Sequence, residues 1–166
     1  MQRILLVWLI IATASMSTPS LGQQLTTFIL VRHAEKVTDK SKDPALTSEG
    51  NDRAIRLATI LEKTTLDAIY TTPYHRTRST VEPVAKQKGV PVVEYEPQKE
   101  SVIDGMLAAH AGKTILVSGH SNTIPEIANW LTGSQTFTEF DENDFGNLII
   151  VTVITKGNSK VTWLRY

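Results

Sequence analysis

The sequence predicts an α/β domain, a three-layer α/β/α sandwich with a mostly parallel central sheet. Short apolar runs alternate along the chain with segments whose apolar residues recur at helical spacing, and glycine or proline stands between them. This alternation is typical of parallel sheets, because consecutive parallel strands need a crossover that is usually a helix. Two β-rich runs flank the turn residues 156–159, which predicts a hairpin and therefore an antiparallel edge at the C-terminus.

In the first half of the chain, strands are expected at 26–31, 66–72 and 90–96. Helices are expected between them, at 47–63 and 73–88. Thr47 can cap the first helix, and Pro73 stands where the second can begin. Gly89 and Pro91 end that second helix.

In the second half, a helix is expected at 99–110, a strand at 114–118 and another helix at 123–131. Pro125 is tolerated in the first turn of the last helix, and Gly133 lies just past its end. Ligands of such sheets bind beyond the carboxyl ends of the strands. The functional residues are therefore expected directly after the strands.

The first 22 residues have the order of a secretory signal: Arg3, an apolar run from Ile4 to about Ala14, and then small and polar residues. The apolar run is short for a membrane span, and an uncleaved anchor is the alternative. Cleavage is expected after Gly22, which would leave residues 23–166 as the domain, without a stable membrane anchor. The protein is therefore predicted to be exported, to a periplasm or the outside.

Composition narrows the range of functions. The chain has no cysteine, which rules out a disulfide framework and thiol catalysis. Its 17 basic and 17 acidic residues give no basic excess, which argues against a nucleic-acid partner. Without the first 22 of its 166 residues it has the 144 of one ordinary domain.

Cationic side chains follow three of the predicted strands. Arg32 and His33 end the first, Arg76 follows the second and His120 follows the fourth. Arginine offers a planar fork of donors that suits phosphate oxygens, and a helix beginning after His120 adds backbone N–H groups. A neutral histidine can attack phosphorus, while cationic neighbours stabilise the transferred group without a metal. The pattern indicates a phosphoryl site.

These residues lie in three motifs that resemble those of the histidine phosphatase superfamily, in its phosphoglycerate mutase-like branch. "LVRHAEK" is similar to the first motif and "VSGHSNTIPEI" to the third. "TTPYHRTRSTVEPVA" resembles the second, where Thr72, Pro73, Arg76 and Thr80 fit. The resemblance covers essentially residues 23–166 and implies a phosphoglycerate mutase-like fold.

The resemblance also implies roles. His33 would be the nucleophile, Arg32 and Arg76 the phosphate clamps, and His120 a second, protonated histidine that stabilises charge. The residues expected to contact substrate are Glu35, Lys36, Ser121 and Asn122.

The chain departs from the family pattern at three places. One is His75, at a variable position beside the clamp, which could line the pocket or point to solvent. Ala34 replaces a glycine, which is acceptable where the backbone torsions are ordinary. The general acid that protonates the leaving group is not evident among the carboxylates after the third strand. We expect it to be Glu100 or Asp104.

The sequence thus predicts a phosphoric monoester hydrolase that works through a phosphohistidine, without metal or cofactor, on a phosphorylated small molecule or an envelope phosphosugar. The alternative is a module of the same fold that binds a phosphorylated ligand without turnover. An esterase with its nucleophile at Ser121 is excluded, because all four histidines precede that serine. A zinc enzyme is disfavoured, because no histidine pair has helical ligand spacing.

Overall fold

A computed structural model describes residues 24–166 of the chain. The predicted signal segment, residues 1–22, lies outside the described residues. Within residues 24–166, no helix has both the length and the apolar character needed to cross a bilayer.

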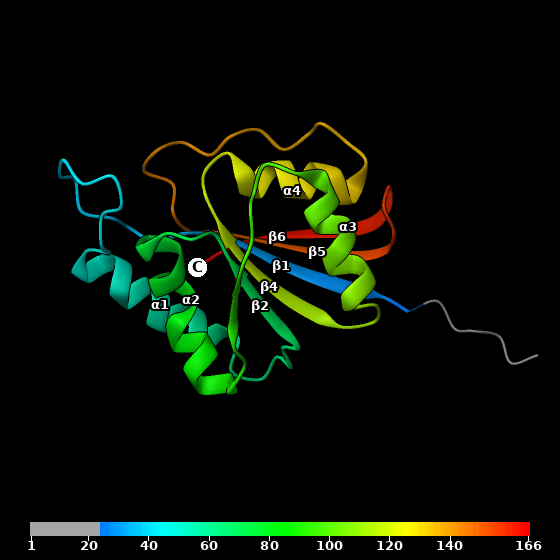
Figure 1. Cartoon of the computed structure of the whole chain (residues 1–166), viewed down its shortest axis with the longest axis horizontal. Coiled ribbons are helices and arrows are strands. Elements are labelled where there is room, and N and C mark those ends of the chain that lie inside the picture. Colours follow the sequence, from blue (N-terminus) through cyan, green and yellow to red (C-terminus); the bar gives the residue numbers. More distant parts are fainter. Residues whose placement is uncertain (1–23) are drawn as a thin grey trace, which may run out of the picture.

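The described chain forms six strands and four helices in the predicted order (Figure 1). The strands are β1 (Thr26–Arg32), β2 (Ala68–Thr71), β3 (Val92–Glu94), β4 (Thr114–Gly119), β5 (Asn147–Thr155) and β6 (Asn158–Arg165). The helices are α1 (Ser48–Ile60), α2 (His75–Lys88), α3 (Glu100–Ala109) and α4 (Thr123–Thr132).

The strands form one sheet in the order β3-β2-β4-β1-β5-β6. Neighbours from β3 to β1 pair in parallel, whereas β5 is antiparallel to both β1 and β6. The sheet is therefore mixed, because the antiparallel part includes the pairing with the central strand β1 and is larger than the edge that was predicted. The carboxyl ends of β1 and β4 lie side by side, with Arg32 opposite Gly119.

The residues of β1 alternate between two cores. Phe28 and Leu30 pack with residues of α3 and α4, whereas Ile29 and Val31 pack with residues of α1 and α2. Figure 1 shows these two helix pairs on opposite sides of the sheet. The α/β/α sandwich predicted from the sequence is thus confirmed.

Local sequence explains where the helices begin and end. Thr47 caps α1 by accepting a hydrogen bond from the backbone N–H of Gly50 at 3.0 Å. Helix α2 begins at His75, two residues later than predicted, and the Asp43 carboxylate accepts the His75 backbone N–H at 2.9 Å. It ends at Gly89, whose φ of 66° is a left-handed conformation suited to glycine.

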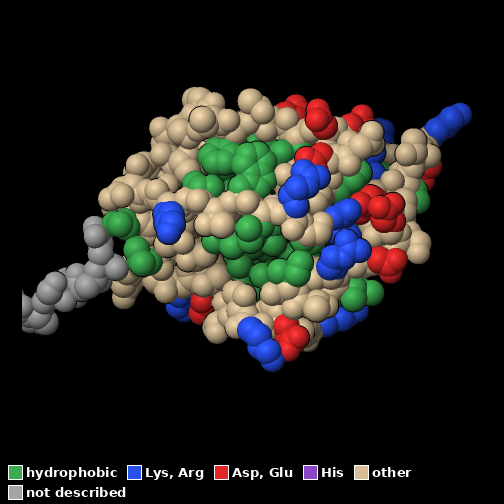
Figure 2. Space-filling model, turned by 180° about the vertical axis from the view of Figure 1, so that it is seen from behind, with side chains coloured by type: hydrophobic (Ala, Val, Ile, Leu, Met, Phe, Trp, Pro, Cys, Tyr) green, Lys and Arg blue, Asp and Glu red, His purple; other side chains and the backbone are tan. Residues whose placement is uncertain are grey.

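The two edges of the sheet carry exposed apolar side chains. The third strand is shorter than predicted, and Val92 and Val93 on it are exposed. Trp163 and Leu164 on the opposite edge strand, β6, are about half exposed, at 49% and 47%. Hydrophobic side chains also gather near the middle of the face seen from behind (Figure 2).

Candidate active site

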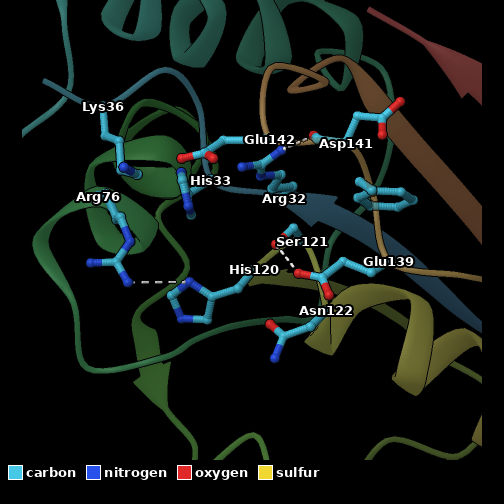
Figure 3. Close-up of a pocket in the computed structure, with 11 residues that line it drawn as sticks. Arg32, His33, Lys36, Arg76, His120, Ser121, Asn122, Glu139, Asp141 and Glu142 are labelled. Carbon is cyan, nitrogen blue, oxygen red and sulfur yellow. Dashed lines mark hydrogen bonds between the residues drawn. The ribbon is translucent and has the colours of Figure 1, made fainter. Parts of the chain in front are cut away.

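A cleft of about 650 Å³ opens where β1 and β4 end. Helix α2 and the segment between α4 and β5, residues 133–146, complete its walls (Figure 3). Its lining residues are Arg32, His33, Lys36, Arg76, His120, Ser121, Asn122, Glu139, Phe140, Asp141 and Glu142.

His33 follows β1 and is only 3% exposed. Its Nδ1 lies 2.8 Å from the Ala34 carbonyl oxygen, and because a carbonyl only accepts, Nδ1 donates this hydrogen bond. The lone pair of a neutral ring is therefore on Nε2. Burial lowers the pKa of His33 to about 3, helped by positive charge on Arg32 and opposed by the hydrogen bond to Ala34. The ring is neutral at physiological pH, as a nucleophile requires.

Ala34 is accommodated without backbone strain. No residue other than glycine has a positive φ within the described chain, so the torsions at Ala34 are ordinary, as expected. Its backbone N–H donates to Thr80 Oγ1 at 2.9 Å. Thr80, which fits the second motif, thereby anchors the turn that carries His33 to helix α2.

His120 faces His33, with ring centroids 5.5 Å apart. Its Nδ1 lies 3.4 Å from Arg76 Nη2, and because a guanidinium only donates, Nδ1 accepts. Nε2 then carries the proton and donates to Thr72 Oγ1 at 3.0 Å. Burial, with positive charge on Arg76 and Arg32, lowers the pKa of His120 to about 4. His120 is thus neutral in the free cleft.

Arg32 is 3% exposed and ties the end of β1 to the α4–β5 segment. Its Nη1 donates to the carbonyl oxygens of Asp141 at 2.7 Å and Asp144 at 3.1 Å. Its guanidinium lies over the ring of Phe145, 4.3 Å from the centroid. Arg32 Nε is buried and has no hydrogen-bond partner among the described residues, so this donor is available for an anion.

Arg76 projects into the cleft from the first turn of α2. Its guanidinium lies 4.4 Å from the ring centroid of Tyr74, and its Nη1 is 3.5 Å from Asp43. Its Nε is also buried without a hydrogen-bond partner in the described chain. Asp43, which also caps α2, was not among the predicted site residues, because its loop carries no local motif.

The two other basic residues at the start of α2 do not line the cleft. Arg78 pairs with Glu94, outside the cleft. The His75 side chain is 71% exposed. Arg76 is thus the residue of this turn that reaches the site.

Three of the four predicted substrate contacts, Lys36, Ser121 and Asn122, line the cleft. Glu35 does not: both its carboxylate oxygens accept from Arg53 Nε at 2.9 Å. It faces a neighbouring groove that shares Lys36 and Glu142 with the cleft. Glu35 therefore holds the backbone after His33 in place and is not positioned to contact a phosphoryl group.

The prediction that Glu100 or Asp104 is the general acid is corrected by their position. Both carboxylates lie on α3 and form ion pairs with Lys156, in the turn between β5 and β6. Neither lines the cleft.

The acidic residues that do line the cleft are Glu139, Asp141 and Glu142, all from the α4–β5 segment and all exposed. Sequence reasoning missed them, although "FTEFDEND" at 137–144 is visibly acidic. Among residues 24–166, no three histidine or acidic side chains are arranged to hold a metal ion.

Comparison with known proteins agrees with this geometry. The family model described as histidine phosphatase superfamily, branch 1, matches residues 28–100, which contain Arg32, His33 and Arg76. In the structure, His120 lies beside His33 and Arg76, although it is outside the matched residues. This match, together with the shared fold, supports assignment of the chain to the histidine phosphatase superfamily. No curated protein matches the chain.

Solved structures of several phosphatases share the fold. The protein histidine phosphatase SixA, complexed with tungstate, superposes with a TM-score of 0.71 at 20% identity, over 84% of this chain and 96% of SixA. A mycobacterial glucosyl-3-phosphoglycerate phosphatase superposes with a TM-score of 0.68 at 9% identity, over 85% of this chain and 99% of its own. A phosphoserine phosphatase mutant from Entamoeba histolytica, in complex with phosphoserine, superposes with a TM-score of 0.64 at 17% identity. The superposition covers 82% of this chain and 95% of the phosphoserine phosphatase.

The buried His33 and the partly buried His120 are expected to make the stability of the protein depend on pH. The folded pKa of His33, about 3, is below its ordinary value of 6.5, so the unfolded chain binds the additional proton between these values. The stabilisation is fully present above about pH 6.5 and is lost as pH falls toward 3. Between pH 7 and pH 4.5 we expect His33 alone to account for a loss of about 2 kcal/mol.

Urea unfolding at the two pH values measures this effect. His33→Ala should reduce the difference in free energy of unfolding between them, whereas His75→Ala, at an exposed ring, should leave it unchanged. An equal pH dependence in wild type and His33→Ala would contradict the buried, neutral state of His33.

Proposed function

We propose that the protein is a metal-independent phosphatase that hydrolyses phosphate monoesters through a phosphohistidine on His33. The observation that carries this proposal is the state of His33: a buried, neutral ring whose Nδ1 donates to a carbonyl. That hydrogen bond leaves Nε2 as the nucleophile, beside His120 and Arg76.

The reaction has two displacements. His33 Nε2 attacks phosphorus, a nitrogen–phosphorus bond forms, and the ester oxygen leaves with the bonding electron pair and takes up a proton from solvent. Water then attacks the phosphohistidine and gives its proton back to solvent, inorganic phosphate leaves, and Nε2 recovers its lone pair. In both steps the donors of Arg32, Arg76 and His120 stabilise charge on the equatorial oxygens.

The charge of His120 then depends on the substrate. In the free cleft Arg76 and Arg32 help to keep this ring neutral, but a bound phosphoryl group adds negative charge and raises its pKa. A phosphate monoester has a second pKa of about 6, so its monoanion can bring the proton that His120 Nδ1 takes up. His120 would then donate to a phosphoryl oxygen.

The cleft contains no buried carboxylic acid among its described residues, so we propose that it favours good leaving groups. Aryl phosphates are of this type, and so are phosphoramidates such as phosphohistidine. The structural similarity to SixA, named a protein histidine phosphatase, supports testing the phosphoramidates. The segment 1–22 separately supports the proposal that the protein is exported and meets a phosphorylated small molecule or an envelope phosphosugar there.

The second candidate is a module that binds a phosphorylated ligand without turnover. It is favoured by the lack of a buried carboxylic acid among the described residues of the cleft, because a site without a buried acid to protonate the leaving group can bind a phosphate ester and leave it intact. The two candidates differ in whether a substrate with a good leaving group is turned over.

Hydrolysis of para-nitrophenyl phosphate in the presence of EDTA tests the proposal, because this substrate needs no acid. We expect turnover with EDTA equal to that without it. Activity that is lost with EDTA and restored by zinc or magnesium would contradict the metal-free mechanism. Phosphate binding without turnover would establish the binding module.

A further inference from the structure

The cleft has walls of opposite charge. Lys36 and Arg76 come from the loop after β1 and from α2, and His33 and His120 lie between them and the opposite wall (Figure 3). That opposite wall is the α4–β5 segment, which contributes the acidic residues Glu139, Asp141 and Glu142. A ligand that fills the cleft therefore spans from positive to negative charge.

The carboxylates of the acidic wall form no close ion pair within the described chain, although burial, which lowers the pKa of the Arg32 guanidinium, is opposed by the charges of Glu142 and Glu139. Asp144 in the same segment, by contrast, pairs with Arg165. Glu139 is also oriented, because its Oε1 accepts from Ser121 Oγ at 2.9 Å, next to His120. In Figure 3 the Glu142 carboxylate extends toward the side of the cleft where His33 lies, whereas that of Asp141 is turned away.

A separate observation supports an anionic ligand at the floor of this cleft. Arg32 is 3% exposed and lines the cleft, and its Nε is buried without a partner in the described chain. Such a donor is expected to meet an acceptor when ligand binds. The acidic wall therefore faces whatever group is attached to the phosphoryl moiety.

We propose that the substrate is a small phosphoryl compound that carries an ammonium group on its leaving-group side, and that Glu139 and Glu142 receive this group. The proposal rests on the phosphoryl site proposed above. The cleft volume suits a small molecule. A second phosphate or a carboxylate at the same position would be repelled by both glutamates, so the wall also selects against dianionic metabolites.

Three phosphonates that cannot be hydrolysed test this selectivity: aminopropylphosphonate, its neutral analogue butylphosphonate, and the anionic phosphonobutyrate. Calorimetric titration of the purified full chain should give the tightest binding for the ammonium compound and the weakest for the carboxylate. We expect about a two- to fivefold difference at each step, as for solvent-exposed charge pairs. The differences should shrink in high salt, which screens exposed charges.

The double variant E139Q/E142Q should bind all three phosphonates with nearly equal affinity. The control E62Q/E82Q removes the same net charge from glutamates outside the cleft, and it should keep the wild-type order. Thermal unfolding of both variants verifies that they are folded.

If the wild type bound the three phosphonates with equal affinity, the ammonium proposal would be overturned, but the proposed phosphoryl site would not. An equal loss of selectivity in the control would also overturn the ammonium proposal, because overall charge would then explain the preference. If no phosphonate binds and para-nitrophenyl phosphate is not hydrolysed, the proposed function itself is overturned, and this inference with it.

Discussion

Replacing His33 by alanine is expected to reduce kcat for para-nitrophenyl phosphate by at least about 10³-fold, because removal of a nucleophile eliminates the covalent route. The variant loses the atom that attacks phosphorus, whereas Arg32, Arg76 and His120 still bind the substrate. The measurement is steady-state hydrolysis in EDTA at saturating substrate, with a thermal unfolding curve to show that the variant is folded.

His75→Ala is the matched control for this variant. His75 begins the helix that carries Arg76, but its side chain is 71% exposed and does not line the cleft. Its replacement should leave kcat within about twofold, as for most surface substitutions. Activity of His33→Ala close to that of His75→Ala would refute His33 as the nucleophile.

Replacing Arg76 by methionine should lower kcat/KM by about 10²- to 10³-fold, the range observed when one charge-stabilising donor is removed. Methionine preserves much of the side-chain length but cannot donate to a phosphoryl oxygen or to His120 Nδ1. Steady-state kinetics with the same aryl phosphate, read as kcat and KM separately, measures the loss.

Arg78→Met is the control for this variant. It distinguishes loss of the Arg76 contacts from loss of one positive charge on α2. Arg78 pairs with Glu94 outside the cleft, so its replacement removes the same charge two residues away. We expect a change of at most about twofold in kcat/KM. Similar losses in both variants would mean that Arg76 acts through long-range charge and not through contact with the phosphoryl group.

The fold was predictable where local sequence and topology agree. The apolar runs at β1 and β4 are buried on both faces and alternate with helices, and this pattern is specific to a sheet between two helical layers. The extent of the antiparallel part was less predictable. Which strand pairs with β5 depends on contacts between residues far apart in sequence, such as Leu30 and Ile149, and no local pattern encodes that choice.

The floor of the site could be predicted, because His33, Arg76 and His120 each follow a strand and parallel strands end at one edge. The charge state of His120 could not be predicted, since it depends on burial and on the approach of Arg76 to its Nδ1. The roles of Asp43 and Glu35 depend on arginine partners that are distant in the chain.

The prediction of the general acid was wrong for a physical reason. Glu100 and Asp104 follow the third strand in sequence, but α3 directs them to Lys156. The segment that reaches over the cleft instead comes after α4, and it has neither helical nor strand periodicity. Its acidic composition was visible, but its position above His33 depends on long-range contacts, among them the hydrogen bonds from Arg32 to two of its carbonyl groups.

The central claim is that the phosphoryl group is transferred to His33 before it reaches water. The most direct test mixes the protein with nearly equimolar aryl phosphate carrying a radiolabelled phosphoryl group. The reaction is stopped in alkali within milliseconds, because phosphohistidine survives base and is lost in acid, and the peptides are then mapped. We predict base-stable, acid-labile label on the peptide that contains His33, appearing together with the first equivalent of released phenol. Release of that first equivalent without label at His33 would contradict the mechanism.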